Sequence, residues 1–272
     1  MLSESLWPVM KRITRNILFT AGTLLIVGIL SNINYDIRII FPWDINNHCF
    51  DSDYWDAKYE KSLEAKLQPD IKGIDVSHHQ GNIDWELVKK AQPKLAFIYV
   101  KCTEGKSYVD PKFKDNANGA AAVGFRIGAY HYFRMTSGAH EQFQNFKAQM
   151  DAVHIELIPM VDVERDDGKP RKELQDSLKV LLDLLEKAYG KRPMIYGTNR
   201  SYNKLCAPEF NYYPLYIGRY GKNKPVITGP SHYTIWQYSE NARIPGIPKP
   251  VDICRFHPIY RENYIARYMS IE

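Results

Sequence analysis

The stretch "IPMVDVERDDG", residues 158–168, runs from apolar side chains into a group of acidic ones. Asp162 and Glu164 lie two positions apart, and side chains at i and i+2 of a strand point to the same face. On strand geometry their Cα atoms are expected roughly 6.6 Å apart. Two charges at the end of a buried strand are costly unless the protein uses them. This stretch therefore predicts a strand that delivers a functional pair of carboxylates.

Seven other short runs resemble it in length and in apolar content. The eight expected strands are "KGIDVS" (72–77), "LAFIYVKC" (95–102), "FRIGAYHYF" (125–133), "LIPMVDVE" (157–164), "PMIYGT" (193–198), "PLYIGRY" (214–220), "YTIWQYS" (233–239) and "PVDIC" (250–254). Their nearly continuous apolar character is typical of strands that are covered on both faces. We therefore expect the α/β class, with a parallel sheet or barrel that begins near Ile71.

Helical patterns separate several of these strands. Three helices are expected, over residues 83–93, 137–154 and 171–190. Asp84 and Ser137 are candidate caps for the first two, and Gly190 ends the leucine-striped third. From about residue 197 onward the connections are loop-like and too short for full helices. The sequence thus predicts a (β/α)-barrel of about eight strands with an incomplete outer ring of helices.

In such a barrel the active site lies at the C-terminal ends of the strands, and acids end three of the eight. Asp75 closes "KGID", Asp162 and Glu164 close "MVDVE", and Asp252 closes "KPVD". Two like charges in close proximity raise the pKa of one of them, which supplies a neutral acid at working pH. Glycoside hydrolysis needs a protonated acid beside a second carboxylate. These four acids are therefore the candidate catalytic residues.

Aromatic side chains occur near the same strand ends. A groove with carboxylates at its floor and aromatic rings on its walls would bind a carbohydrate chain. The candidate substrate-binding residues are Tyr99, Tyr130, Tyr132, Tyr216 and Trp236.

Along residues 71–260 the motifs resemble, in order, those of glycoside hydrolase family 25, the Chalaropsis-type lysozymes. They are "GIDVSHHQGNIDW", "FIYVKCTEG", "YVDPKF", "GAYHYF", "MVDVE", "MIYGT" and "WQYS" followed by "VD". The resemblance implies an incomplete (β/α)-barrel and an N-acetylmuramidase that cleaves the β-1,4 bond after N-acetylmuramic acid in peptidoglycan. By motif, Glu164 is then the general acid and Asp162 its partner carboxylate. Asp75 and Asp252 would flank them, and Tyr130 would line the −1 sugar site.

Some positions depart from the family pattern. "PLYIGRY" has Tyr216 and Gly218-Arg219 where similar enzymes more often carry Trp and a small apolar residue, and Cys254 stands where the family usually has Asn. These positions are expected at the rim or floor of the groove, so they bear on substrate detail and efficiency. They also keep an alternative open, a catalytically weak, membrane-anchored peptidoglycan-binding protein.

Two other enzyme classes fit the residues less well. A metal-dependent hydrolase would draw ligands from the acids and from His78, His79 and His131. Adjacent histidines usually point apart, however, and no spacing such as H-x-x-x-H is present. A family 18 chitinase carries a further Asp two residues before its D-x-E pair, where this chain has Met160. The mechanism stays open between inverting, retaining and substrate-assisted routes, because the sequence does not give the carboxylate separation.

Charge and cysteine placement exclude further functions. The net charge of +5 is scattered, with no long basic run, which argues against nucleic-acid binding. Cys49, Cys102, Cys206 and Cys254 form no CxxC pair, so a zinc knuckle is not expected. Cys102 and Cys254 lie on apolar runs and are expected as buried free thiols. One disulfide stays open for an extracytoplasmic domain, with no pair favoured by spacing. We expect a monomer without metal or cofactor.

The first 70 residues have a different composition. A basic cluster from Lys11 to Arg15 precedes an apolar core from Ile17 to Leu30. This core is shorter than the roughly 20 residues of a full span unless flanking polar residues reach the interface. No small-residue cleavage site follows it. We expect residues 1–33 to be an uncleaved signal anchor, 34–70 a stalk and 71–272 the catalytic domain. The basic cluster then stays in the cytoplasm and the catalytic domain is extracytoplasmic, periplasmic or at the cell surface; cleavage would make it secreted.

Overall fold

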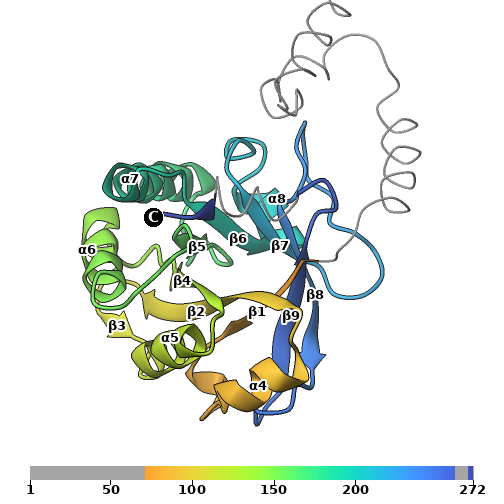
Figure 1. Cartoon of the computed structure of the whole chain (residues 1–272). Coiled ribbons are helices and arrows are strands. Elements are labelled where there is room, and N and C mark those ends of the chain that lie inside the picture. Colours follow the sequence, from red (N-terminus) through yellow and green to blue (C-terminus); the bar gives the residue numbers. More distant parts are fainter. Residues whose placement is uncertain (1–70, 261–268, 272) are drawn as a thin grey trace, which may run out of the picture. The chain divides into compact units, whose positions relative to one another are not determined.

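The computed structural model describes residues 71–260 and 269–271, which form a barrel of strands with helices along part of its outside (Figure 1). The predicted anchor and stalk, residues 1–33 and 34–70, lie outside the described residues. Within the described ranges, no helix combines the length and the apolar content that crossing a membrane requires. In chain order the elements are β1 (Lys72–Val76), η1 (His78–Gln80), α4 (Trp85–Ala91), β2 (Leu95–Glu104), β3 (Tyr108–Val109), α5 (Phe113–Ala122), β4 (Arg126–Tyr132), α6 (Ala139–Met150), β5 (Met160–Asp162), α7 (Arg171–Tyr189), β6 (Met194–Thr198), α8 (Asn199–Leu205), β7 (Leu215–Gly218), β8 (Ile235–Ala242) and β9 (Val251–Phe256).

Eight of the described strands close into a ring in the order β1, β2, β4, β5, β6, β7, β8 and β9, and β9 pairs back to β1. Neighbours from β1 through β8 are parallel. β9 is antiparallel to both β8 and β1, and the short β3 pairs with β2 outside the ring. All eight predicted strands and the barrel are confirmed. The expectation of parallel pairing is wrong for β9, because only residues 243–250 join it to β8, and a parallel crossover needs a dozen or more residues.

The barrel has an inner and an outer apolar layer, which explains why its strands are apolar on both faces. On β8, Ile235 packs in the inner layer with Tyr99, whereas its neighbour Trp236 packs in the outer layer against the helices. The interior is tightly filled. A Cβ placed on Gly128 would lie 2.3 Å from the Tyr99 ring, so this glycine makes room for an inward-facing aromatic side chain.

Helices cover the outside of the barrel between β1 and β7. α7 buries its predicted leucine stripe and ends at Gly190, whose φ of 66° is left-handed. The Asp84 carboxylate accepts a backbone amide of α4 at 3.0 Å, which confirms that cap. The predicted cap Ser137 is wrong by one residue. Gly138 holds that position, because the Glu141 side chain turns back to accept the Gly138 amide at 3.2 Å.

Two helices go beyond the sequence prediction. α5 lacks a stripe of large apolar residues, since apart from Phe113 its buried apolar side chains are Ala117 and Ala120. α8 is a seven-residue helix within a stretch expected to be loop, and Thr198 caps it by accepting the Ser201 amide at 3.0 Å. Between residues 206 and 260 the structure has no further α-helix, so the predicted incomplete outer ring is confirmed.

Candidate active site

The four predicted acids come together at one end of the barrel. Asp252 on β9 is the direct Cα partner of Asp75 on β1. Asp162 ends β5, and Glu164 follows two residues later. The charge of Glu164 contributes to a raised pKa at each of the other three acids. The structure therefore places the four carboxylates in one electrostatic cluster.

Asp75 and Asp252 form a pair within this cluster. The hydroxyl of Tyr216 donates to Oδ2 of Asp75 at 2.6 Å, and the amide of Gln237 donates to the same oxygen at 3.0 Å. Burial raises the pKa of Asp75 to about 6 in spite of these hydrogen bonds. Burial and the charge of Asp75 raise the pKa of Asp252 to about 8. Adjacent carboxylates do not both ionise freely, so the pair holds one proton near neutral pH.

Asp162 is the most buried of the four acids, with 7% of its surface exposed. Its Oδ1 has no hydrogen-bond partner among the described residues. Burial raises its pKa well above the ordinary value, and the charge of Glu164 adds to this effect. An unpartnered buried oxygen costs about 1–3 kcal/mol. Such a cost is retained where a ligand supplies the missing partner.

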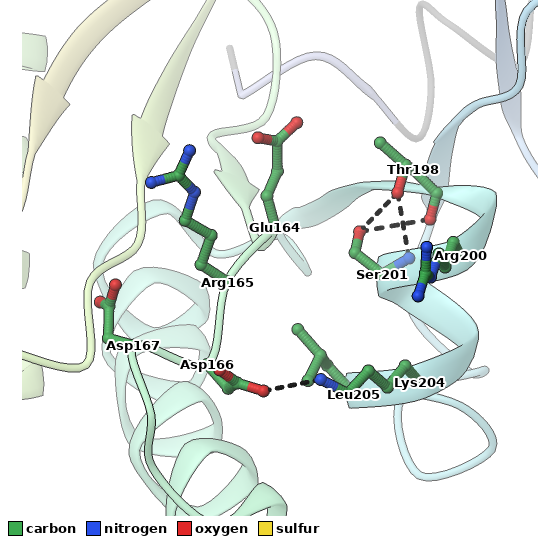
Figure 2. Close-up of a pocket in the computed structure, with 9 residues that line it drawn as sticks. All are labelled: Glu164, Arg165, Asp166, Asp167, Thr198, Arg200, Ser201, Lys204 and Leu205. Carbon is green, nitrogen blue, oxygen red and sulfur yellow. Dashed lines mark hydrogen bonds and ion pairs between the residues drawn. The ribbon is translucent and has the colours of Figure 1, made fainter.

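Glu164 extends beyond the end of β5 and is partly exposed. The hydroxyl of Tyr132 on β4 donates to its Oε2 at 3.4 Å. Figure 2 shows the Glu164 carboxylate at one side of a pocket, pointing away from the segment that carries it. A carboxyl group with one long hydrogen bond and open space before it is placed to exchange a proton with a bound molecule.

Lys101 lies close to this cluster and was not predicted from the sequence. Its side chain is 13% exposed and its ammonium forms an ion pair with Glu104 at 2.9 Å. The ammonium also lies 5.2 Å from the centre of the Tyr132 ring, and its charge opposes the rise in the pKa of Asp162. A lysine inside an otherwise apolar strand was the available signal, because a buried ammonium needs a partner.

Gln237 and Tyr196 are further polar residues that the sequence prediction missed. The Tyr196 hydroxyl donates to the side-chain oxygen of Gln237 at 2.8 Å, and Gln237 in turn donates to Asp75. Strand alternation was the signal in "IWQYS". Ile235 and Gln237 share the inner face, whereas Trp236 between them faces outward.

Tyr130 and Tyr132 are the predicted aromatics that lie beside the acids. Both are partly buried. The pKa of Tyr130 is raised by burial first and then by the charges of Asp75 and Asp162. The exposed Tyr220 lies near the same group, since its side chain hydrogen-bonds with that of Tyr196.

The other three predicted sugar-binding aromatics are buried and offer no exposed face. Tyr99 donates its hydroxyl to a backbone carbonyl in the barrel interior at 3.1 Å. Trp236 packs in the outer layer, and its indole N–H donates to the carbonyl of Arg219 at 2.7 Å. Tyr216 is fully buried and reaches the site only through the hydrogen bond to Asp75. In this structure Tyr99 and Trp236 contribute packing and Tyr216 holds an acid, and sugar contact by these three side chains stays a prediction.

The departure at Cys254 lies beneath the acid pair. Cys254 is fully buried in the inner layer, its thiol hydrogen-bonds with Tyr216, and burial raises the pKa of the thiol. Cys102, Cys206 and Cys254 are buried free thiols, which confirms the prediction for Cys102 and Cys254. Cys49 lies outside the described residues.

Of the histidines considered as metal ligands, His78 and His131 are held in separate hydrogen bonds, and the ring of His79 lies beside that of His78 with 4.0 Å between the centroids. The Nδ1 atom of His78 lies 2.7 Å from a carboxylate oxygen of Asp110. His131 is fully buried between Thr103 and Gln142, with contacts of 2.8 and 3.0 Å. In the part of the chain that the structure describes, no group of three or more His, Cys, Asp or Glu side chains could hold a metal ion.

Comparisons with known proteins identify the family of the chain. The model of the family described as glycosyl hydrolases family 25 matches residues 74–247. The chain belongs to glycosyl hydrolase family 25. This confirms the family predicted from the motifs, and with it the assignment to the glycoside hydrolases.

Individual relatives are similar in sequence or structure to more than half of this chain. YegX of Escherichia coli K12, an uncharacterized protein, is 34% identical over 195 residues, which is 71% of each chain. The autolytic lysozyme of Clostridium acetobutylicum is 29% identical over 186 residues, or 68% of this chain and 56% of the relative. A family 25 glycosyl hydrolase structure from Bacillus anthracis has a TM-score of 0.65 at 26% identity, and the match covers 83% of this chain and 98% of that one.

Proposed function

We propose that the chain hydrolyses the β-1,4 bond between N-acetylmuramic acid and N-acetylglucosamine in peptidoglycan, with Glu164 as general acid and Asp162 as partner carboxylate. Relatives in the family carry the names autolytic lysozyme and N,O-diacetylmuramidase. The observation that carries the proposal is the acid cluster, in which a buried carboxyl with an unpartnered oxygen stands beside the partly exposed Glu164. This arrangement provides both the proton donor and the second carboxylate that glycoside hydrolysis requires.

The unpartnered Oδ1 of Asp162 is the acceptor for the substrate's 2-acetamido N–H. That hydrogen bond would favour the ionised form of Asp162, because a donated hydrogen bond stabilises a carboxylate. The bound sugar would at the same time cover Glu164, whose carboxyl group would face the leaving glycosidic oxygen as its proton donor.

The unpartnered Oδ1 of Asp162 favours the substrate-assisted route among the three that the sequence left open. An Asp162 oxygen that accepts the acetamido N–H orients the acetamido group and is engaged in that hydrogen bond instead of attacking the anomeric carbon. The acetamido oxygen then attacks the anomeric carbon as Glu164 protonates the leaving oxygen, and Glu164 later takes a proton from the attacking water. Net retention in the first-formed product supports this route against inversion, and trapping of a covalent Asp162 ester would show direct attack instead.

Asp75 and Asp252 would supply a single negative charge beside the reacting sugar. Their pair holds one proton near neutral pH, so it stabilises the positive charge that develops on the ring without adding a second charge near Glu164. Tyr216 and Gln237 fix the orientation of Asp75 for this role.

The test is digestion of purified peptidoglycan by the full chain, by Glu164→Gln and by the control Glu86→Gln, an exposed residue on α4. Borohydride reduction and mass spectrometry identify the new ends. We expect reduced muramic-acid ends from wild type and control, with at least about a 100-fold lower rate for Glu164→Gln. If all three proteins bind the polymer and none of them releases new ends, the result contradicts hydrolysis and supports the alternative of a wall-binding protein.

We further propose that residues 1–33 anchor the chain in a membrane and that the barrel acts on the extracytoplasmic side, where peptidoglycan lies. The basic cluster before the apolar core supports this orientation. A reporter enzyme fused after residue 272 should be active outside the cytoplasm. Reporter activity confined to the cytoplasm would contradict the orientation.

A further inference from the structure

A pocket of about 450 Å³ adjoins the proposed general acid. It lies between the segment that follows β5 and the helix α8, with Glu164 at one side (Figure 2). Its volume falls within the roughly 300–1,000 Å³ that is typical of ligand sites. The reacting sugar would lie in front of Glu164, so whatever enters this pocket is attached close to the bond that is cleaved.

Charged side chains dominate the pocket. Arg165 lines it on the segment after β5, with its guanidinium directed away from α8, and Arg200 and Lys204 line it on α8 (Figure 2). All three are exposed. Lys204 is already engaged, because its ammonium lies 2.8 Å from a carboxylate oxygen of Asp166. Within the described residues, the side chains of Arg165 and Arg200 take part in no hydrogen bond or ion pair.

Asp167, a further acid of the pocket, is also neutralised, in this case by a residue that does not line the pocket. The carboxylate of Asp167 accepts from Nε of Arg134 at 3.0 Å and from the amide of Met135 at 2.9 Å. With Asp166 and Asp167 each balanced by a cation, the uncompensated charges are those of Arg165, Arg200 and Glu164. When Glu164 carries the proton that its role requires, the pocket lining has a net positive charge from two flexible, exposed arginine side chains that an incoming ligand can engage.

We propose that this pocket is a subsite for the stem peptide of peptidoglycan, in which Arg165 and Arg200 bind a peptide carboxylate. The inference rests on the proposed function, because the muramic acid next to the cleaved bond carries a peptide with free carboxylates. Guanidinium groups bind carboxylates through paired hydrogen bonds, which gives direction as well as charge. On muramic acid without a peptide, the lactyl carboxylate is a second source of the same chemistry, but it is held close to the ring, whereas the pocket leads away from Glu164.

The experiment compares two polymers and three forms of the full chain. The polymers are glycan strands that carry stem peptides and the same strands stripped by an amidase, which hydrolyses the amide between lactyl group and peptide and so frees the lactyl carboxylate. The proteins are wild type, Arg165→Gln/Arg200→Gln and the control Arg126→Gln. Arg126 is exposed at the start of β4, at the end of the strand opposite to Tyr132. The readouts are kcat/KM for new reducing ends and sedimentation with each polymer, at low and at high salt.

For the double variant we expect kcat/KM and binding to fall roughly 3- to 10-fold on stem-bearing strands, the size expected of two exposed charge contacts. On stripped strands it should match wild type. High salt should remove the difference by lowering the wild-type value, because exposed charges are screened. Arg126→Gln should match wild type on both polymers.

Equal losses on both polymers would overturn the proposal by assigning the guanidinium groups to the sugar, and no loss on either would overturn it as well. These failures leave the proposed function intact if wild type releases muramic-acid ends. Conversely, if wild type releases no ends but sediments with stem-bearing strands in a manner that the double variant loses, the subsite stands and the hydrolytic function fails.

Discussion

Replacing Tyr216 with Phe would test whether a buried hydroxyl sets the ionisation of the acid pair. The Tyr216 hydroxyl donates to Oδ2 of Asp75 at 2.6 Å, and Gln237 supplies the second donor at 3.0 Å. Both hydrogen bonds favour the carboxylate form, and burial opposes them, which leaves the pKa of Asp75 at about 6. The variant removes the shorter hydrogen bond and keeps the buried ring.

The magnitude follows from the strength of that hydrogen bond. A hydrogen bond to a charged group contributes about 1.5–3 kcal/mol, and one pKa unit corresponds to about 1.36 kcal/mol. The pKa of Asp75 should therefore rise by ~1–2 units, to roughly 7–8. At neutral pH, Asp75 would change from mostly ionised to largely protonated, and the charge that supports the reacting sugar would be reduced.

The assay is a carboxyl ¹³C NMR titration of aspartate-labelled protein, together with the pH dependence of kcat/KM on peptidoglycan. Tyr99→Phe is the matched control, because Tyr99 is equally buried but donates to a backbone carbonyl at 3.1 Å. The control should lose about 1 kcal/mol of stability and leave the Asp75 titration in place. If Tyr216→Phe titrates at the wild-type pH as well, the hydroxyl does not set the ionisation of Asp75 and the reasoning is refuted.

Three other perturbations have defined outcomes. The pKa values of about 6 for Asp75 and about 8 for Asp252 in the folded protein exceed the ordinary 3.8. The folded state therefore binds more protons than the unfolded state, and the free energy of unfolding decreases as pH rises through about 6 to 8. Calorimetry should show a Tm that falls over that pH range. Asp252→Asn should raise Tm at the alkaline end by about 2–4 °C per kcal/mol of stability regained. An equally steep fall of Tm in the variant would contradict a shared proton in the Asp75–Asp252 pair. Gly128→Ala should cost about 1–3 kcal/mol in denaturant unfolding, because its Cβ would lie 2.3 Å from the Tyr99 ring, and less in a Tyr99→Leu background. EDTA should leave the release of reducing ends unchanged, because His78 and His131 are each engaged by their own hydrogen-bond partners. A loss of activity that zinc restores would instead support a metal-dependent hydrolase.

The barrel could be predicted because burial on both faces leaves a strong mark on the sequence. Each strand of the ring lies between the inner and outer apolar layers, so each reads as a short, nearly continuous apolar run. α7 was equally clear, since its stripe of leucines is long and periodic. α5 was missed because alanines that pack closely on β2 and β4 give little contrast with its exposed residues.

The acids were easier to place than the aromatics for a physical reason. A carboxylate at the end of a buried run needs a special environment, so its presence already indicates a site. A tyrosine or tryptophan is at home in either layer, and only the phase of the strand decides. The sequence predicts Tyr99 and Trp236 as groove residues, whereas in the structure one fills the interior and the other packs in the outer layer. Gln237, the neighbour of Trp236, is the residue of that strand that hydrogen-bonds with Asp75.

Asp252 was assigned to the site by a rule that does not apply to its strand. The rule places functional residues at the C-terminal ends of parallel strands, whereas Asp252 is the second residue of β9. It reaches the site because β9 runs antiparallel, so that its beginning lies at the same end of the barrel as the other strands' C-terminal ends. Antiparallel pairing also sets Asp252 directly opposite Asp75. A slip of β9 by one residue would turn Asp252 to the other face, and Asp75 would lose the neighbour with which it shares a proton. The register of this one antiparallel strand therefore creates the acid pair on which the proposed chemistry depends.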